Sequence, residues 1–285
     1  MSFEVTILGS SAAIPTSKRH PSAQLVNLLG RFFLFDCGEG TQIQLRRFGF
    51  KIQKIDYICI SHLHGDHYLG LIGLLSTMNL LNRTKELIIF APDGLDEILE
   101  LHFRLSYSKI LFPFRIVNLK ELDLFKLFEG DNFELFSFGL KHRIPCWGFK
   151  LTEKKRSRKI IPKMIKIHNI PFQSISSIKN GGDFITESGR VILNKDLTID
   201  SYQQRSYAYC SDTKYFKALV KYVKDVDLLY HESTFHSCLA SMAKSTFHST
   251  SQDAATVARQ ANVKKLIIGH FSSRYKELDI LKEDA

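Results

Sequence analysis

The sequence predicts an α/β fold in which two sheets carry helices on their outer faces. Short apolar segments with the composition of strands alternate with helix-like segments along most of the 285 residues. The early strand-like segments follow one another closely, as in hairpins, whereas helix-like segments separate most of the later ones, as in β-α units. Together these observations indicate two sheets with helices packed outside them.

Each predicted element rests on its own composition and boundaries. Ten apolar, strand-like ranges are bounded by turn residues: Phe3–Gly9, Ala23–Leu28, Arg31–Asp36, Asp56–Ile60, Glu86–Ala91, Phe133–Phe138, Trp147–Thr152, Ser206–Cys210, Asp227–His231 and Lys265–Gly269. Five ranges are helix-like: Gly40–Phe48, Tyr68–Leu81, Asp93–Tyr107, Tyr215–Val223 and Ser251–Ala261. For the last helix, Thr250 or Ser251 serves as N-cap, and Asp253 in the first turn complements the helix dipole.

The composition is that of a basic protein with enough apolar residues to form a large core. Hydrophobic residues make up 44% of the chain, and 39 Lys and Arg against 29 Asp and Glu give a net charge of +10. Such a charge suggests a nucleic-acid partner, although many basic proteins bind none. The net charge alone therefore does not establish a nucleic-acid partner, and the distribution of the charges along the chain has to be considered.

One segment differs in composition from the rest of the chain. Between residues 154 and 166 there are seven basic residues and no acid, and a turn-rich stretch follows at 180–183. We expect a single domain over residues 1–285 with an arm inserted at about 153–202 and projecting from it. The arm is either a solvated surface or a docking surface for polyanions. Its basic residues are Lys154, Lys155, Arg156, Arg158, Lys159, Lys163 and Lys166.

Cysteine usage and the absence of apolar runs bear on the compartment. The five cysteines are widely spaced and form no C-x-x-C pair, which indicates reduced thiols. The first residues lack the basic and apolar regions of a secretory leader, and no apolar run approaches the ~18 residues of a membrane span. We therefore expect a cytoplasmic protein that does not bind membranes.

The segment 62–67 concentrates metal-ligand chemistry where a predicted strand ends. It reads His-Leu-His-Gly-Asp-His and thus carries three imidazoles and one carboxylate within six residues. Imidazole and carboxylate are the ligands of catalytic Zn²⁺, which keeps an open position for water. His62 and His64 alternate in extended backbone and can face one ion, while Asp66 and His67 lie beyond Gly65 and can face another. The segment therefore predicts a site for two metal ions.

Three further polar residues occupy the same kind of position. His142 comes after the strand-like range 133–138, Asp212 follows 206–210, and His270 follows 265–269. Each lies just past the carboxyl end of an apolar strand, as the segment 62–67 does. Their shared placement makes them candidates for the remaining ligands.

The order of these candidates resembles that of the metallo-β-lactamase superfamily and, more narrowly, of the ribonuclease Z family. The match extends from residue 3 to about residue 276 and is weakest in the arm. The motifs that carry it are Leu-Gly-Ser at 8–10, Phe-Asp-Cys-Gly-Glu-Gly-Thr-Gln at 35–42, His-Arg-Ile-Pro at 142–145, His-Glu-Ser-Thr-Phe at 231–235, His-Ser-Thr at 248–250 and Gly-His-Phe-Ser-Ser-Arg-Tyr at 269–275.

This resemblance implies an αββα sandwich with two Zn²⁺ ions between the sheets, Mn²⁺ and Fe²⁺ being alternatives. It gives Asp66 the role of general base and places His248, held by Glu232, near the leaving oxygen. Two such ions would lower the pKa of a water molecule toward ~7, and an imidazolium at His248 would supply the leaving group's proton. The implied ligands are His62, His64 and His142 for one ion, Asp66, His67 and His270 for the other, and Asp212 for both.

The family resemblance also implies a substrate and an assembly. It suggests an endoribonuclease that removes the 3′ trailer from precursor tRNA by attack of a metal-activated hydroxide, leaving a 3′-hydroxyl on the tRNA. In the family the arm clamps the tRNA, and a homodimer lets one subunit's arm hold substrate for the other. Arg19, in the loop 15–20, and Arg274 join the seven arm cations as candidate RNA contacts. The range 171–175 departs from the family's Gly-Pro element, and His20 stands where Asn is common.

Two other functions are compatible with the same ligands. One is a related small-molecule phosphodiesterase or arylsulfatase, which would not need an RNA-binding arm. The other is a catalytically silent RNA-binding protein on the same fold, although such a protein has no need for seven filled ligand positions.

Overall fold

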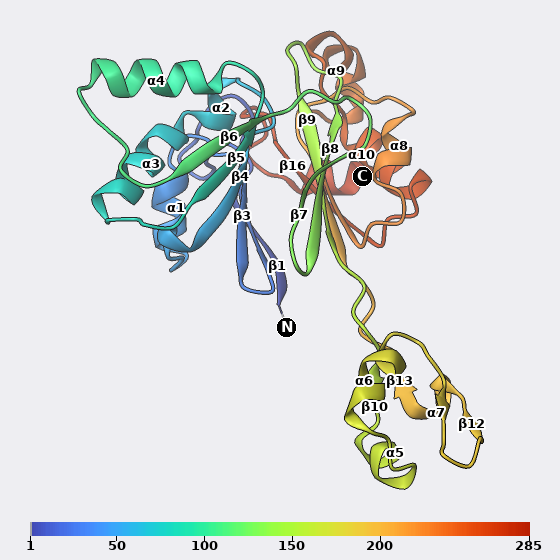
Figure 1. The fold of residues 1–285 in the computed structure, drawn as a ribbon. Helices are drawn as coiled ribbons and strands as arrows, with labels where there is room; N and C mark the ends of the chain where they lie inside the picture. The colour runs from blue at the N-terminus through green and yellow to red at the C-terminus, as the bar shows by residue number, and fades with distance from the viewer. Residues whose placement is uncertain (1) are drawn as a thin grey trace. The chain divides into compact units, whose positions relative to one another are not determined.

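The computed structural model describes residues 2–285 and divides them into two compact units. Unit 1 comprises residues 2–128, 135–151 and 206–285, and unit 2 comprises residues 129–134 and 152–205. Unit 1 holds the two large sheets and most of the helices (Figure 1).

The first sheet of unit 1 has six strands in sequential order. Strands β1 to β3 pair antiparallel and β3 to β6 pair parallel. The helices that connect its parallel strands lie on one side of it (Figure 1). The strands are β1 (Phe3–Gly9), β2 (Ala23–Leu28), β3 (Arg31–Phe35), β4 (Ile55–Cys59), β5 (Leu87–Ala91) and β6 (Phe114–Asn118); the helices are α1 (Thr41–Arg47), η1 (Ile52–Lys54), α2 (Gly65–Tyr68), α3 (Gly70–Leu80) and α4 (Leu95–Leu105).

The second sheet also has six strands, in the order β16-β15-β14-β9-β8-β7. Its β14, β15 and β16 are parallel. Residues of α8 and α10 pack with the outward side chains of β14 and β15 in one buried cluster. The elements are β7 (Phe125–Glu129), β8 (Phe133–Gly139), β9 (Trp147–Glu153), β14 (Ser206–Cys210), α8 (Leu219–Tyr222), β15 (Leu228–Glu232), η2 (Ser237–Leu239), α9 (Ala240–Thr246), α10 (Ser251–Gln260), β16 (Lys265–Gly269) and α11 (Asp279–Asp284).

Alternating side chains of β3 show how the two sheets are joined. Leu34 packs into the cluster that the first sheet forms with its helices, whereas Phe35 points to the opposite face because strand side chains alternate. The Phe35 ring lies 5.7 Å from both Phe149 of β9 and Tyr209 of β14, measured between centroids. An aromatic layer therefore fills the space between the sheets, as expected for a four-layer sandwich.

Unit 2 has a small core of its own, in which Ile170, Ile178, Ile192 and Leu197 are buried. It comprises the range 152–205, close to the predicted arm at 153–202, together with the turn at 129–134. Its role as a docking arm stays a prediction. Its elements are β10 (Lys159–Ile160), α5 (Pro162–Ile167), α6 (Phe172–Lys179), β11 (Phe184–Ile185), β12 (Val191–Ile192), α7 (Asn194–Leu197) and β13 (Thr198–Ile199).

The structure differs from the prediction at two helices, and it adds strands β6 and β7, the short elements of unit 2, and helices α9 and α11. The expected helix 68–81 is divided into α2 and α3, and the one at 215–223 shortens to the four residues of α8. Strands β6 and β7 are absent from the prediction because their half-exposed residues lack the apolar pattern of the inner strands. The N-cap of α10 is Thr250, which forms a capping box with Asp253.

The cysteines and the helices bear on the expectations of reduced thiols and of a chain without a membrane span. Cys37, Cys59, Cys146 and Cys210 are free and buried, and Cys238 is free and exposed. Among the helices of residues 2–285, none has the length and hydrophobicity required to cross a bilayer.

Arg83 fastens the turn after α3 to neighbouring strands, and we expect its replacement to destabilise the fold. Its guanidinium donates to the backbone carbonyls of Gln53, Lys85, Ile55 and Glu86 at 2.8–3.0 Å. Arg83→Met keeps much of the apolar stem but leaves these acceptors unpaired, which should cost about 3 kcal/mol. Urea unfolding measures the loss. The exposed Arg104→Met is the control, and equal stability of the two variants would contradict the prediction.

Candidate metal centre

Seven predicted ligand residues meet at one edge of the sandwich in unit 1. Four of them follow β4: His62 and His64 in the connecting loop, and Asp66 and His67 in α2. The other three follow strands β8, β14 and β16 of the second sheet. Because each comes from the end of a strand that leads to the same edge, residues far apart in sequence converge. Those three are His142, Asp212 and His270.

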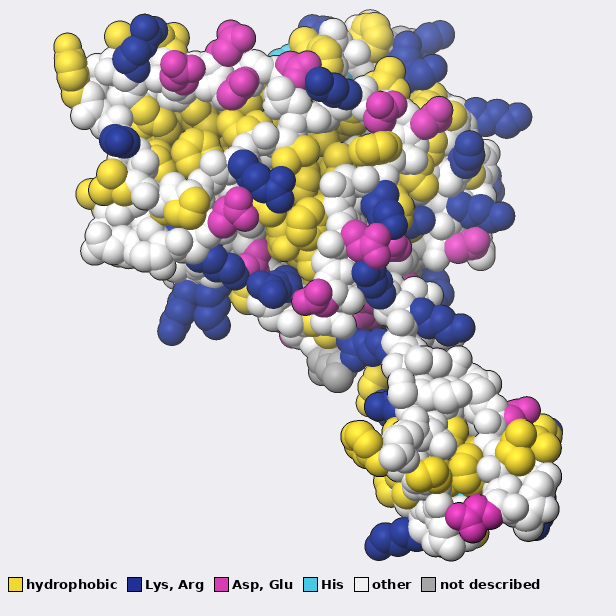
Figure 2. Space-filling view, in the orientation of Figure 1, with side chains coloured by type: hydrophobic (Ala, Val, Ile, Leu, Met, Phe, Trp, Pro, Cys, Tyr) yellow, Lys and Arg dark blue, Asp and Glu magenta, His cyan; other side chains and the backbone are white. Residues whose placement is uncertain are grey.

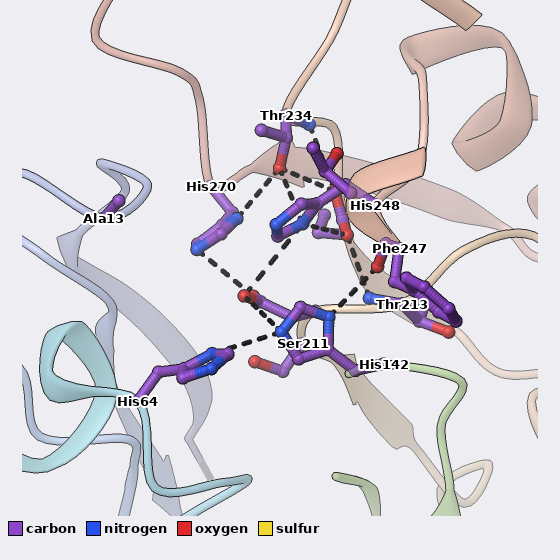
Figure 3. A network of polar contacts seen from close by, with 12 residues as sticks. Ala13, His64, His142, Ser211, Thr213, Thr234, Phe247, His248 and His270 are labelled. Atoms are coloured by element: carbon purple, nitrogen blue, oxygen red, sulfur yellow. Dashed lines mark hydrogen bonds and ion pairs between the residues drawn. The ribbon is translucent and has the colours of Figure 1, made fainter. Parts of the chain in front are cut away.

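The first ligand group consists of three imidazoles and a carboxylate. The Nδ1 atom of His64 lies 3.0 Å from Nε2 of His62 and 3.1 Å from Nε2 of His142. Oδ2 of Asp212 lies 3.6 Å from Nε2 of His62 and 3.9 Å from Nε2 of His142. All four ligand atoms lie within 4.8 Å of one another, which is the spacing of atoms around a single cation. Figure 3 shows His64 and His142 pointing toward each other.

The second group consists of Asp66, His67 and His270. Oδ2 of Asp66 lies 3.3 Å from Nε2 of His67 and 3.4 Å from Nε2 of His270. These three ligand atoms also lie within 4.8 Å of one another.

Asp212 lies between the two groups and presents a different oxygen to each. Its Oδ2 faces His62 and His142, whereas its Oδ1 lies 3.1 Å from Nε2 of His270 and 3.4 Å from Nε2 of His67. The carboxylate is almost completely buried, at 2% exposure. A buried carboxylate with this arrangement can contact two cations at once.

Hydrogen bonds on the far side of three of the rings orient these histidines with Nε2 toward the site. His67 Nδ1 lies 2.7 Å from Oδ2 of Asp36, and His142 Nδ1 lies 3.0 Å from the Phe247 carbonyl. Both partners are acceptors, so each Nδ1 carries a proton and Nε2 is the ring atom that faces into the site. His270 Nδ1 lies 2.9 Å from Oγ1 of Thr234, whose hydroxyl proton goes to Glu232, so the same holds for His270. Such outer contacts are typical of metal-binding histidines.

The electrostatics of the site also fit a cation. Burial lowers the pKa of His67, but the charges of Asp212, Asp66 and Asp36 outweigh it and raise that pKa well above its usual range. The site therefore stabilises positive charge at this position. Two buried atoms that face each other, His67 Nε2 and Asp212 Oδ1, have no hydrogen-bond partner. A divalent cation would satisfy both atoms and supply the charge.

Asp36 supports the centre from behind, a role that the sequence did not reveal. It is fully buried after β3, with a left-handed backbone (φ 55°). Its carboxylate accepts hydrogen bonds from the backbone and hydroxyl of Ser61 at 2.7 and 2.8 Å and from the Tyr209 hydroxyl at 2.6 Å, in addition to His67. In the sequence Asp36 is an acid at the end of a predicted strand and a member of the motif at 35–42, but neither observation names its partners.

We expect Asp36→Asn to weaken metal binding by about 10- to 100-fold, the usual effect of losing such an outer partner. The amide cannot offer two charged oxygens to this set of donors, so the His67 ring loses its fixed tautomer. Competition with a chromogenic chelator measures the affinity. Asp56→Asn replaces another buried aspartate, near the opposite end of β4, and serves as the control. Equal metal affinities in the two variants would contradict this role.

His248 and Glu232 form a pair beside the metal ligands. Nδ1 of His248 lies 2.9 Å from Oε1 of Glu232, which is fully buried and also accepts the backbone N–H of Thr213 at 2.9 Å. Burial alone would lower the pKa of His248, but the charge and hydrogen bond of Glu232 raise it to about 9. The ring is only partly buried and lines a cavity. It is thus placed to hold a proton next to a bound substrate.

A cavity of about 620 Å³ opens over both ligand groups. Asp66, Asp212 and His248 reach it from the floor, and Arg143 and Glu39 border it. The cavity is large enough for a phosphodiester with its neighbouring sugars.

The predicted RNA-contact residues occupy varied surroundings. Arg19 donates to the carbonyl oxygen of Tyr275 at 2.8 Å, so it ties the N-terminal loop to the segment after β16. Arg274 is exposed, and its guanidinium lies 4.9 Å from the centroid of the Phe235 ring at the cavity.

Within unit 2, acids outside the range 154–166 engage three of the seven arm cations. Lys154 lies 2.6 Å from Glu129, Arg156 lies 3.4 Å from Glu153, and Arg158 pairs with Asp200. The Lys159 ammonium lies 3.9 Å from the Tyr202 ring. The remaining cations, which are exposed and have no ion pair in the described part of the chain, are Lys155, Lys163 and Lys166.

Proteins of similar sequence extend over nearly the whole chain. It is 40% identical over 283 residues to a "Ribonuclease Z" of Parabacteroides distasonis and 43% identical over 288 residues to a "Ribonuclease Z" of Bacteroides fragilis. Each alignment covers 99% of this chain and 93% of the relative. Residues 3–142 also match the family described as "Anti-Pycsar protein Apyc1".

Solved structures of similar fold include the short form of human tRNase Z. That protein has a TM-score of 0.73 and 32% sequence identity, and the alignment covers 96% of this chain and 94% of the human one. The metallo-β-lactamase fold protein YhfI of Bacillus subtilis has a TM-score of 0.67 at 18% identity, with 98% and 90% covered, and bears on the fold alone. The sequence identities, the shared fold and the ligand geometry place this chain in the ribonuclease Z family of the metallo-β-lactamase superfamily.

Proposed function

We propose that the protein is a metal-dependent endoribonuclease that removes the 3′ trailer from precursor tRNA in the cytoplasm. The observation that carries the proposal is the Asp212 carboxylate, which offers one oxygen to each of two ligand groups. It occurs in a chain 40–43% identical to proteins named "Ribonuclease Z". That identity favours the nuclease over a small-molecule hydrolase or a silent RNA-binding protein. Two Zn²⁺ ions fit these ligands, and Mn²⁺ or Fe²⁺ would also be accepted.

The residues of the chain divide the work of hydrolysis. Divalent cations, when bound, lower the pKa of water and neutralise the charge that develops on a phosphodiester. Asp66 accepts the backbone N–H of Ala13 at 2.7 Å. Burial would raise the pKa of Asp66, but the positive charge of the nearby His67 holds it well below its usual range. The carboxylate therefore stays ionised and orients the attacking water by accepting its hydrogen bond.

His248 delivers the proton that the leaving oxygen needs. Glu232 holds its Nδ1, which leaves Nε2 for the substrate, and the raised pKa of His248 keeps the ring protonated at neutral pH. With the proton given to the 3′-oxygen of the tRNA, that fragment leaves with a 3′-hydroxyl and the trailer keeps the phosphate. A positioned acid of this kind accelerates such a step by about 10²- to 10⁴-fold.

Unit 2 and a second subunit would hold the body of the tRNA. The cations Lys155, Lys163 and Lys166 are exposed and available to phosphates. In the proposed homodimer the arm of one subunit would hold the RNA at the site of the other. Sedimentation of the protein with and without precursor tRNA tests this assembly.

Cleavage of a precursor tRNA with a 3′ trailer tests the function itself. We expect the purified protein to release the trailer and leave a 3′-hydroxyl, to contain about two metal ions per chain, and to lose cleavage when a chelator removes them. A tRNA that lacks the trailer serves as the control and should stay intact. Failure to cut the precursor, in protein that carries its full complement of metal, would refute the proposal.

A further inference from the structure

A row of lysines leads away from the cavity across the surface of unit 1. Lys217, Lys221 and Lys224 are exposed, and Lys214 is half-buried. Lys141, also exposed, joins them because the backbone N–H of Lys214 donates to its carbonyl at 3.0 Å. We call these five residues the lysine row. Figure 2 shows Lys and Arg side chains gathered along the edge of unit 1 that carries α8.

The lysine row begins at the metal centre. Lys141 precedes His142, and its backbone N–H donates to Oγ1 of Thr213, directly after Asp212, at 3.0 Å. The Lys214 ammonium lies 4.5 Å from the centroid of the Phe247 ring, whose own backbone carbonyl holds the His142 imidazole. The first two lysines of the row are therefore built into the same segments that present two of the metal ligands.

The backbone at 214–226 keeps the lysines pointing outward. Leu219, Tyr222 and Val223 are buried against α10 and the second sheet, which fixes the segment in one orientation. The three outer lysines alternate with these buried residues along the chain and are themselves exposed. Lys221 lies in α8, and Lys217 and Lys224 lie in the turns before and after that helix.

The row has an excess of positive charge, because residues 214–226 contain four lysines and one acid, Asp225. None of its five lysines has an ion pair within residues 2–285, in contrast to Lys154 of unit 2 and Lys264 of unit 1. Two acids near the segment accept hydrogen bonds from other residues: Asp123 accepts the Tyr222 hydroxyl at 2.9 Å, and Asp225 accepts the Asn262 amide at 2.8 Å. Neighbouring ammonium groups without ion pairs repel one another, so the row favours a polyanion.

We propose that the lysine row binds the sugar-phosphate backbone of the precursor RNA as it passes to or from the cavity. This inference rests on the proposed function and adds a contact surface on unit 1 that is separate from the arm. An ammonium is a compact charge that binds phosphates irrespective of base sequence. The row should therefore contribute affinity and position but no sequence preference.

The test uses the full-length protein with Lys217, Lys221 and Lys224 changed to Gln. The two inner lysines stay unchanged because they adjoin metal ligands. Equilibrium binding to precursor tRNA is measured by fluorescence anisotropy at several salt concentrations. We expect the dissociation constant to rise at least tenfold, and the slope of log K against log salt to become shallower by about 3, one for each lost phosphate contact.

A matched variant removes the same charge elsewhere. It carries Gln at Lys51, Lys54 and Lys109, which are exposed on the side of the first sheet. It should bind like the unchanged protein, and metal content and the unfolding midpoint verify that both variants are intact. Equal binding by the two variants would overturn the lysine row while leaving the nuclease proposal standing. Failure of the unchanged protein to bind and cut precursor tRNA would overturn both.

Discussion

Asp212→Asn is expected to lower RNA cleavage by about 10³-fold or more and to remove most of the bound metal. The side chain keeps its shape but loses its charge, and one of its two oxygens becomes an NH₂ group that cannot bind a cation. Because each carboxylate oxygen faces a different ligand group, the change weakens both at once. The loss of several kcal/mol of charge stabilisation corresponds to this change in rate. Elemental analysis of the purified variant and single-turnover cleavage measure the two effects.

The control for this variant is Asp131→Asn, which removes one charge from an exposed turn. It should keep both metal and activity. A variant Asp212→Asn that retains two ions and full turnover would show that the carboxylate is not shared, and the proposed centre would have to be redrawn with separate ligands.

His248→Ala is expected to slow cleavage of precursor tRNA by about 10²- to 10⁴-fold while the metal content stays near that of the unchanged protein. Unlike Asp212, His248 is held by a protein carboxylate, Glu232, rather than placed deep within either ligand group. The missing function is a proton for the leaving oxygen. Turnover rate and metal content, measured on the same preparation, separate this role from metal binding.

The leaving group provides a sharper version of the His248 test. A chromogenic phosphodiester with a nitrophenolate leaving group needs no protonation, so His248→Ala should slow its hydrolysis far less than that of RNA. His102→Ala, an exposed histidine on α4, is the control. Equal losses with both substrates would indicate that His248 orders the site instead of donating a proton.

The candidate ligands could be predicted from the sequence because of their positions relative to the strands. His142, Asp212 and His270 each come after a buried strand, and the ends of such strands meet at one edge of the fold. The inner strands were equally visible, since their apolar runs are those of buried sheet. The edge strands β6 and β7 lack that pattern because solvent covers part of each.

Contacts between segments far apart in the sequence could not be predicted from local sequence patterns. Asp36 lies 25 residues from Ser61 and 173 from Tyr209, and nothing in its neighbourhood announces these partners. In the arm, too, the sequence does not reveal contacts that folding creates. Its run of cations contains no acid, yet Glu129 and Asp200 neutralise two of them through folding. The unpaired charge of unit 1, at Lys217 to Lys224, is spread too thinly along the sequence to appear as a run.

The origin of the ligands has a consequence for thermal stability. Four of them follow β4 of the first sheet, and three follow β8, β14 and β16 of the second sheet. An ion bound by residues of both halves would cross-link the two sheets. Its removal would therefore weaken the fold as well as the activity. Ligand linkage then predicts that free metal at 100 times its dissociation constant adds about 2.7 kcal/mol to the free energy of unfolding. The melting temperature of this protein should accordingly rise with metal concentration. When a chelator is present, we expect unfolding to begin with the separation of the two halves.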